Sequence, residues 1–294
     1  MRPTYLYVFF FSLACPALSM AADPASKISQ GAILDSIPFD PQSTPGRIVL
    51  DLAKDGSPSL PLILDTGANL SVLTPGLARQ IGVSVRRSKT TPYRRATRLG
   101  RDLQFYVDAR RSDTRSPAGF EYGVLGSDFL DDYVLEIDFE ERRVRFFDPA
   151  HYRVPDQANG LSETVLPMTL GGTRAFVELE VEGQPLKVLI DTGAPDTLIV
   201  SGQALAKLGI EWRDLPELAP YHTSRGEMQV RRYDANQLEI GKLGVTDKAI
   251  TVAPHGWHNL AGSKDSALGI GLLQDFLVRI DYPRRRLWLR RGGS

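Results

Sequence analysis

The chain has 294 residues, 42% of them hydrophobic, which is enough to bury the core of one large domain or of two smaller ones. Lysine plus arginine equals aspartate plus glutamate at 35 each, so the overall charge indicates neither a nucleic-acid partner nor a membrane surface. The single cysteine excludes an internal disulfide, and the four histidines show no metal-ligand grouping, so neither a metal site nor a cofactor is expected.

Residues 1–21 have the pattern of a secretory signal peptide. A positive start, Met1-Arg2, precedes the apolar run Tyr5–Ala14, and Ser19-Met20-Ala21 places small residues around a cleavage site. A run of about ten residues is too short to span a bilayer. We therefore expect an exported protein, periplasmic or secreted, that is cleaved after Ala21 and has no stable membrane span. A lipid anchor at Cys15 is a less favoured alternative, because the preceding residues resemble a bacterial lipobox only loosely.

The remaining chain contains one pattern twice. An alternating strand, a turn and an apolar strand lead into LILDTGANLSVLT (62–74) in the first unit and into VLIDTGAPDTLIV (188–200) in the second. A short helix is predicted after each, because Thr74-Pro75 and Ser201-Gly202 combine a capping hydroxyl with a permissive first position. Glycines at 82 and 209 are typical of helix ends.

The far ends of the two units also match. The segment Val124–Phe147 aligns without a gap on Ala267–Arg290, and each predicts a hairpin of two strands joined by a charged turn. We therefore expect a mostly β protein of two pseudo-symmetric β-barrel lobes. The predicted boundaries are 22–153 for the first lobe, 154–164 for a polar linker and 165–294 for the second lobe.

Two Asp-Thr-Gly turns on related halves suggest a chemistry that a single turn does not. A pseudo-two-fold axis can bring Asp65 and Asp191 face to face, and two carboxylates ~3 Å apart share one proton. One carboxylate can then act as general base on a water, while the protonated carboxyl donates to the carbonyl under attack. This arrangement can hydrolyse an amide without a metal or a nucleophilic side chain.

These residues resemble a known family. The stretch LIDTGAPDT (Leu189–Thr197) is similar to the Leu-Leu-Asp-Thr-Gly-Ala-Asp-Asp-Thr signature of the retroviral-type aspartic proteases, the retropepsins. Their apolar-apolar-Gly element is matched by Val124-Leu125-Gly126 and Ala267-Leu268-Gly269. The resemblance covers nearly all of residues 35–291. It implies a bacterial single-chain aspartic protease with two retropepsin-like lobes, a monomer that forms an intramolecular pseudo-dimer and acts on peptides or proteins.

The resemblance implies that Asp65 and Asp191 are catalytic. It further assigns the support of the active-site loops to Thr66, Gly67, Ala68, Thr192, Gly193, Ala194, Leu125, Gly126, Leu268 and Gly269. Alanine at 68 and 194 replaces a hydroxyl that pepsin-like enzymes have there, which favours the protonated dyad and predicts an optimum at about pH 5–7.

The halves differ after Asp-Thr-Gly-Ala. The two acidic residues usual in the family are replaced by Asn69-Leu70 and Pro195-Asp196, so the resemblance predicts asymmetric subsites with Asn69 and Asp196 at the substrate. The shared Pro-Tyr pairs add Tyr93 and Tyr221 as residues of hairpins closing over the cleft. Two alternatives to an intramolecular peptidase stay open: a non-catalytic module that binds peptide or cell-wall material, and halves that pair between chains.

Overall fold

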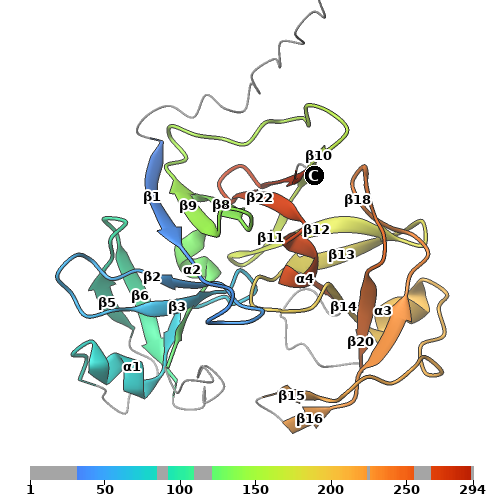
Figure 1. Cartoon of the computed structure of the whole chain (residues 1–294), viewed down its shortest axis with the longest axis horizontal. Coiled ribbons are helices and arrows are strands. Elements are labelled where there is room, and N and C mark those ends of the chain that lie inside the picture. The colour runs from blue at the N-terminus through green and yellow to red at the C-terminus, as the bar shows by residue number, and fades with distance from the viewer. Residues whose placement is uncertain (1–31, 85–91, 109–120, 224–225, 255–265, 293–294) are drawn as a thin grey trace, which may run out of the picture.

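The computed structural model describes residues 32–84, 92–108, 121–223, 226–254 and 266–292. It is mostly β, with one lobe from each half of the chain and a third sheet that joins the lobes (Figure 1). The expected fold class, two pseudo-symmetric β lobes that each carry a short helix after the Asp-Thr-Gly loop, is confirmed.

The first lobe is a six-stranded sheet built around two strands that are buried on both faces. Such strands read as continuous apolar runs, which is why "PLIL" and "GVL" form its centre. The order across the sheet is β2 (Val49–Asp51), β3 (Pro61–Leu64), β7 (Gly123–Leu125), β4 (Val72–Leu73), β6 (Asp102–Val107) and β5 (Tyr93–Ala96).

The second lobe has a nine-stranded sheet with the same centre and extra strands at one edge. Its order is β17 (Arg231–Asp234), β20 (Ala249–Ala253), β14 (Leu198–Ser201), β21 (Ser266–Leu268), β13 (Gln184–Ile190), β12 (Arg174–Val181), β18 (Leu238–Ile240) and β19 (Leu243–Val245), and β11 (Thr169–Gly171) pairs with β12. A separate hairpin consists of β15 (Tyr221–Thr223) and β16 (Gly226–Met228).

Equivalent strands of the two lobes pair in the same directions. The pairs β3–β7 and β13–β21 are parallel, and β4–β7 and β14–β21 are antiparallel. The pairs β4–β6 and β14–β20 are again parallel, and β5 and β17 then run antiparallel to their neighbours. By this pairing β5 is the counterpart of β17.

A six-stranded sheet joins the lobes, with three strands from each half. Its order is β1 (Ile33–Pro38), β9 (Arg143–Phe147), β8 (Val134–Asp138), β22 (Phe276–Asp281), β23 (Arg286–Arg291) and β10 (Glu163–Pro167). The hairpins β8–β9 and β22–β23 are those expected from the matched segments, and β8 and β22 run antiparallel at the centre. The last two residues of the predicted linker 154–164 already belong to β10.

Two helices follow the Asp-Thr-Gly loops and two shorter ones follow the Leu-Gly pairs. They are α1 (Pro75–Gln80), α3 (Gly202–Lys207), α2 (Ser127–Leu130) and α4 (Ile270–Leu273). The predicted caps are confirmed: the hydroxyl of Thr74 accepts from Leu77 N and that of Ser201 from Ala204 N, both at 3.1 Å. Gly82 and Gly209, at φ 81° and 77°, end the turns that follow the helices.

One hydrophobic core runs through both halves and contains the ends of both central strands, Leu64 and Ile190.

Among the described residues, no helix is long and apolar enough to cross a membrane.

Candidate active site

Each Asp-Thr-Gly loop leaves a buried strand beside the Leu-Gly pair of its own half. Asp65 follows β3 and donates its backbone N–H to Leu125 O over 3.0 Å. Asp191 follows β13 and donates to Leu268 O over 2.9 Å. The parallel pairing of each central strand therefore determines where its aspartate emerges.

The glycines of the Leu-Gly pairs allow the loops to pack against them. A Cβ on Gly126 would lie 2.6 Å from the carbonyl carbon of Leu70, and one on Gly269 would lie 2.3 Å from the carbonyl oxygen of Asp196. The next residue in each half donates its N–H to the loop: Ser127 to Ala68 O and Ile270 to Ala194 O, both over 2.8 Å. These contacts hold both loops in matching positions.

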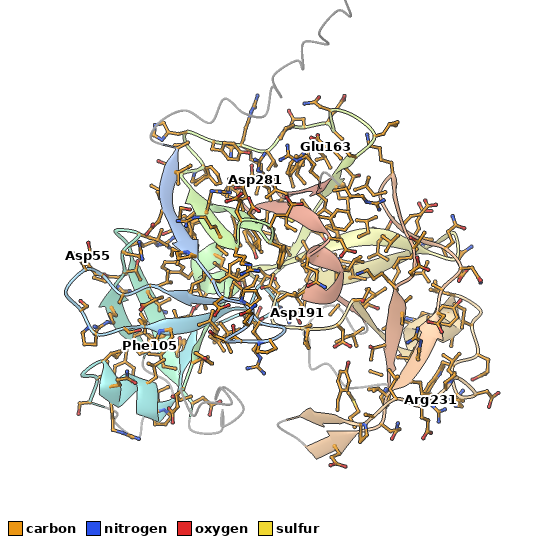
Figure 2. The ribbon with its side chains drawn as sticks, in the orientation of Figure 1. Asp55, Phe105, Glu163, Asp191, Arg231 and Asp281 are labelled. Carbon is orange, nitrogen blue, oxygen red and sulfur yellow. The ribbon has the colours of Figure 1, made fainter. Side chains whose placement is uncertain are left out.

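The two aspartates face one another where the lobes meet, and Figure 2 shows Asp191 there, between the lobes. A Cβ on Gly67 would lie 2.4 Å from the carboxyl carbon of Asp191, and one on Gly193 would lie 2.7 Å from that of Asp65. Each carboxyl group thus lies over the glycine of the other loop, and the two are hydrogen-bonded to each other. Glycine is required at both positions, because a side chain would displace the opposing carboxyl group.

Two buried threonines connect the loops beneath the aspartates. The hydroxyl of Thr66 donates to Ile190 O over 2.7 Å, and that of Thr192 donates to Leu64 O over 2.7 Å. Each hydroxyl also accepts the other threonine's backbone N–H, at 3.0 and 3.1 Å. Since both side chains are fully buried, each half satisfies polar groups of the other that water cannot reach.

The environment favours a proton on the pair. Burial, followed by the negative charge of Asp65, raises the pKa of Asp191 to about 8. Backbone N–H groups of Gly193 and Ala194 act in the opposite direction, and Gly193 N donates to Asp191 Oδ1 over 2.9 Å. The pair is therefore expected to hold one proton at neutral pH.

The residues after the loops differ between the halves. Asn69 is exposed, and its carbonyl oxygen accepts from Thr173 of the other half over 3.4 Å. The carboxylate of Asp196 accepts hydrogen bonds from Tyr221 and, over 2.7 Å, from Thr251. The first half has Leu70, 46% exposed, at the position of Asp196.

The predicted equivalence of Tyr93 and Tyr221 is not the one that the strands show. Tyr221 begins β15, whereas Tyr93 begins β5, the counterpart of β17. The ring of Tyr93 stacks on Phe105 at 5.7 Å between centroids, and its hydroxyl donates to Ser84 O over 3.3 Å. Figure 2 shows Phe105 within the first lobe, away from Asp191, so Tyr93 packs into its own lobe. The shared Pro-Tyr pair suggested a wrong equivalence because it is a match of two neighbouring residues, whereas the pairing of strands depends on residues far apart in the chain.

Arg174 was not anticipated as a residue near the dyad. It is 3% exposed at the start of β12; burial lowers its pKa, and the nearby Asp191 acts in the opposite direction. The repeat carried a signal for it, because Arg47 occupies the matching place before the first central strand. Within the described part of the chain, no group of three or more His, Cys, Asp or Glu is placed to hold a metal ion.

Solved structures with similar architecture include a retropepsin-like aspartic protease from Rickettsia conorii, 25% identical, with a TM-score of 0.36, covering 44% of this chain and 90% of that one. Basic 7S globulin from soybean is 12% identical, with a TM-score of 0.41, and the match covers 88% of this chain and 94% of the globulin chain. Conglutin gamma, a basic 7S globulin from lupine seeds, is also 12% identical, with a TM-score of 0.45, covering 90% and 96%. No curated protein sequence matches the chain.

The sequence match is to one protease family. Residues 177–274 match the family described as gag-polyprotein putative aspartyl protease. The matched segment contains the Asp191 loop and the Leu268-Gly269 pair that supports it. Over these residues the chain is therefore similar to the retropepsin-like aspartic proteases, and its first half places a second Asp-Thr-Gly loop against this segment.

Proposed function

We propose that the protein is an aspartic endopeptidase whose catalytic groups are Asp65 and Asp191. The observation that carries the proposal is the reciprocal packing of the loops, in which each carboxyl group lies over the glycine of the other loop and bonds to the other carboxyl group. A binding module would gain nothing from enclosing two carboxyl groups together, because the arrangement opposes their ionisation. A peptidase uses the shared proton.

In the proposed reaction the ionised carboxylate takes a proton from a water held between the two groups. The water oxygen attacks the carbonyl carbon, and the protonated carboxyl donates its proton to the carbonyl oxygen. The resulting diol collapses as the C–N bond breaks, with one proton going to the leaving nitrogen. A diol proton returns to the dyad, which is left with one proton as at the start.

We further propose that the protein acts as an exported monomer on peptide or protein substrates. The signal-like residues 1–21 support export, and the hydrogen bonds between Thr66 and Thr192 within one chain support intramolecular pairing of the halves. Sequencing the N-terminus of the exported protein tests cleavage after Ala21, and mass measurement tests lipidation at Cys15.

The decisive experiment compares the native chain with Asp65→Asn and Asp191→Asn on a peptide library across pH. Each substitution keeps the shape of the site and removes one carboxyl group, so each should lower kcat/KM at least ~10³-fold. Glu182→Gln is the control and should cleave normally, because this carboxylate of the second lobe bonds Tyr233 and Asn236 and takes no part in the dyad. Normal cleavage by either aspartate variant, or none by the native chain, would reject the proposal and favour a binding module.

A further inference from the structure

The β15–β16 hairpin is connected to the second catalytic loop at Tyr221. The Tyr221 hydroxyl donates to Asp196 Oδ1, and Asp196 stands five residues after Asp191 in the same loop. The hydroxyl of Thr251, in β20, donates to the same oxygen over 2.7 Å. Two hydroxyl groups from different elements therefore meet on one carboxylate, and such charge-assisted bonds are among the stronger ones in proteins.

The surroundings of Tyr221 keep it a donor. Its ring packs on a small apolar cluster that includes Ala194 and Val230. Burial, and next the bond to Asp196, raise the pKa of Tyr221 to about 12, so the hydroxyl remains protonated throughout the working range of a peptidase.

The acceptor is held by the structure that supports the catalytic loop. The backbone oxygen of Asp196 accepts from Gly271 N over 2.9 Å, and it lies 2.3 Å from the position that a Cβ on Gly269 would take. The hairpin is thus attached to the same end of α4 that positions the Asp191 loop. In Figure 1 the hairpin lies on the side of the molecule opposite the six-stranded joining sheet.

The first half does not share this connection. Leu70 stands in place of Asp196 and has no carboxylate. Tyr106 stands in place of Thr251, because Val72 pairs with Val124 and Tyr106 as Ile199 pairs with Ala267 and Thr251. The hydrogen bond from the hairpin to the catalytic loop is therefore a feature of the second half.

We propose that Tyr221 is a positioning residue, whose hydroxyl fastens the β15–β16 hairpin to the second catalytic loop through Asp196 so that both hold the substrate as one surface. Tyr221 then acts through Asp196 and does not touch the substrate with its hydroxyl. The kinetic consequences rest on the proposed peptidase function, whereas the attachment of the hairpin to the loop by the Tyr221–Asp196 hydrogen bond does not.

The test uses Tyr221→Phe, which removes only the hydroxyl, in the full chain. Tyr233→Phe is a matched control, because the Tyr233 hydroxyl donates to Glu182 over 2.8 Å in the same lobe and its pKa is likewise raised to about 12. Hydrogen exchange of the peptide covering 218–230 should quicken about tenfold in Tyr221→Phe and stay unchanged in Tyr233→Phe. Equal exchange in the native chain and Tyr221→Phe would overturn the proposal.

Kinetics separate positioning from direct contact. Tyr221→Phe should raise KM for a peptide substrate about tenfold with kcat within about twofold, and Tyr233→Phe should change neither. Asp196→Ala should have the same effect, and the double variant should be no worse than Asp196→Ala alone. Additive effects would show that Tyr221 meets the substrate itself and overturn the proposal. If Asp196→Ala does not fold, Asp196→Leu replaces it, because leucine is the residue that the first half has at this position, Leu70. If the native chain cleaves nothing, the proposed peptidase function is wrong. The hydrogen-exchange comparison still tests whether the Tyr221 hydroxyl attaches the hairpin to the loop.

Discussion

At the level of single residues, Asp191 is a carboxyl group that the fold holds in an unfavourable place for its charge. Burial and then the charge of Asp65 raise its pKa from 3.8 to about 8. The same perturbation has a consequence for stability and another for catalysis.

Asp191 should make the protein less stable as the pH rises. Below about pH 4 the folded and unfolded chains both hold the proton, but between there and pH 8 the unfolded chain releases it more readily. Asp191→Asn removes this effect, and its amide oxygen can still accept from Gly193. We expect the variant to melt at least ~3 °C above the native protein at pH 8, with the gap closing toward pH 4. Thermal unfolding at both pH values checks this, and a gap that widens toward acid would contradict it.

For the proposed peptidase, the raised pKa of Asp191 also sets an alkaline limit of activity. The dyad loses its shared proton as the pH passes about 8, and with it the donor to the substrate carbonyl. The logarithm of kcat/KM should therefore bend downward near pH 8, above an optimum at about pH 5–7 inferred from Ala68 and Ala194. A pH–rate profile on one peptide measures this decrease of kcat/KM on the alkaline side. A maximum at pH 2–3 is the result that this account does not allow.

At the level of elements, the joining sheet carries an ion pair between the lobes. Glu136 of β8, 2% exposed, accepts from Arg279 of β22 over 2.5 Å and from Arg145 of β9 over 2.6 Å. The Arg279 guanidinium also lies 4.5 Å from the ring centroid of Trp288. A buried pair costs desolvation to form, but removing one partner leaves the other charge uncompensated.

Glu136→Met should therefore destabilise the protein by about 3–5 kcal/mol, whereas Glu136→Met with Arg279→Met should recover most of the loss. Chemical denaturation measures both variants. The surface pair of Arg213 and Glu211 is the control, and Glu211→Met should cost less than about 1 kcal/mol. If the double variant were as unstable as the single one, the charge would not be the cause.

Features that depend on residues close together in the chain were predicted correctly from the sequence. The caps at Thr74 and Ser201 formed as predicted, because a capping hydroxyl satisfies a backbone N–H three residues away in the chain. The hairpins β8–β9 and β22–β23 formed because their two strands are adjacent in sequence. Tyr93 was misplaced for the opposite reason, since the partner of its strand was not readable from neighbouring residues.

At the level of the whole molecule, neither half completes the candidate active site by itself. Thr66 and Thr192 each satisfy a carbonyl group of the other half, and each aspartate is packed over the other half's glycine. These contacts lie within one chain, so the dyad should be intramolecular.

Mixing Asp65→Asn with Asp191→Asn tests the intramolecular dyad. In one chain the two intact aspartates never meet, so the mixture should be no more active than either variant alone, even after the two are unfolded and refolded together. Halves that pair between chains would instead restore a site with both aspartates. Activity assays, with sedimentation to establish a monomer, distinguish the two cases.

The amino-acid sequence was sufficient to predict two mostly β lobes, the strand ends that carry the Asp-Thr-Gly loops, and the starts of the helices that follow them. These features depend on periodicity and on groups a few residues apart. The three-dimensional structure was needed to show four contacts. The threonine hydroxyls bond to the opposite half, Arg174 lies near Asp191, Glu136 bonds Arg279, and Tyr221 bonds Asp196. These groups are distant along the chain, and they come within hydrogen-bonding or electrostatic range only because the chain packs into its folded form.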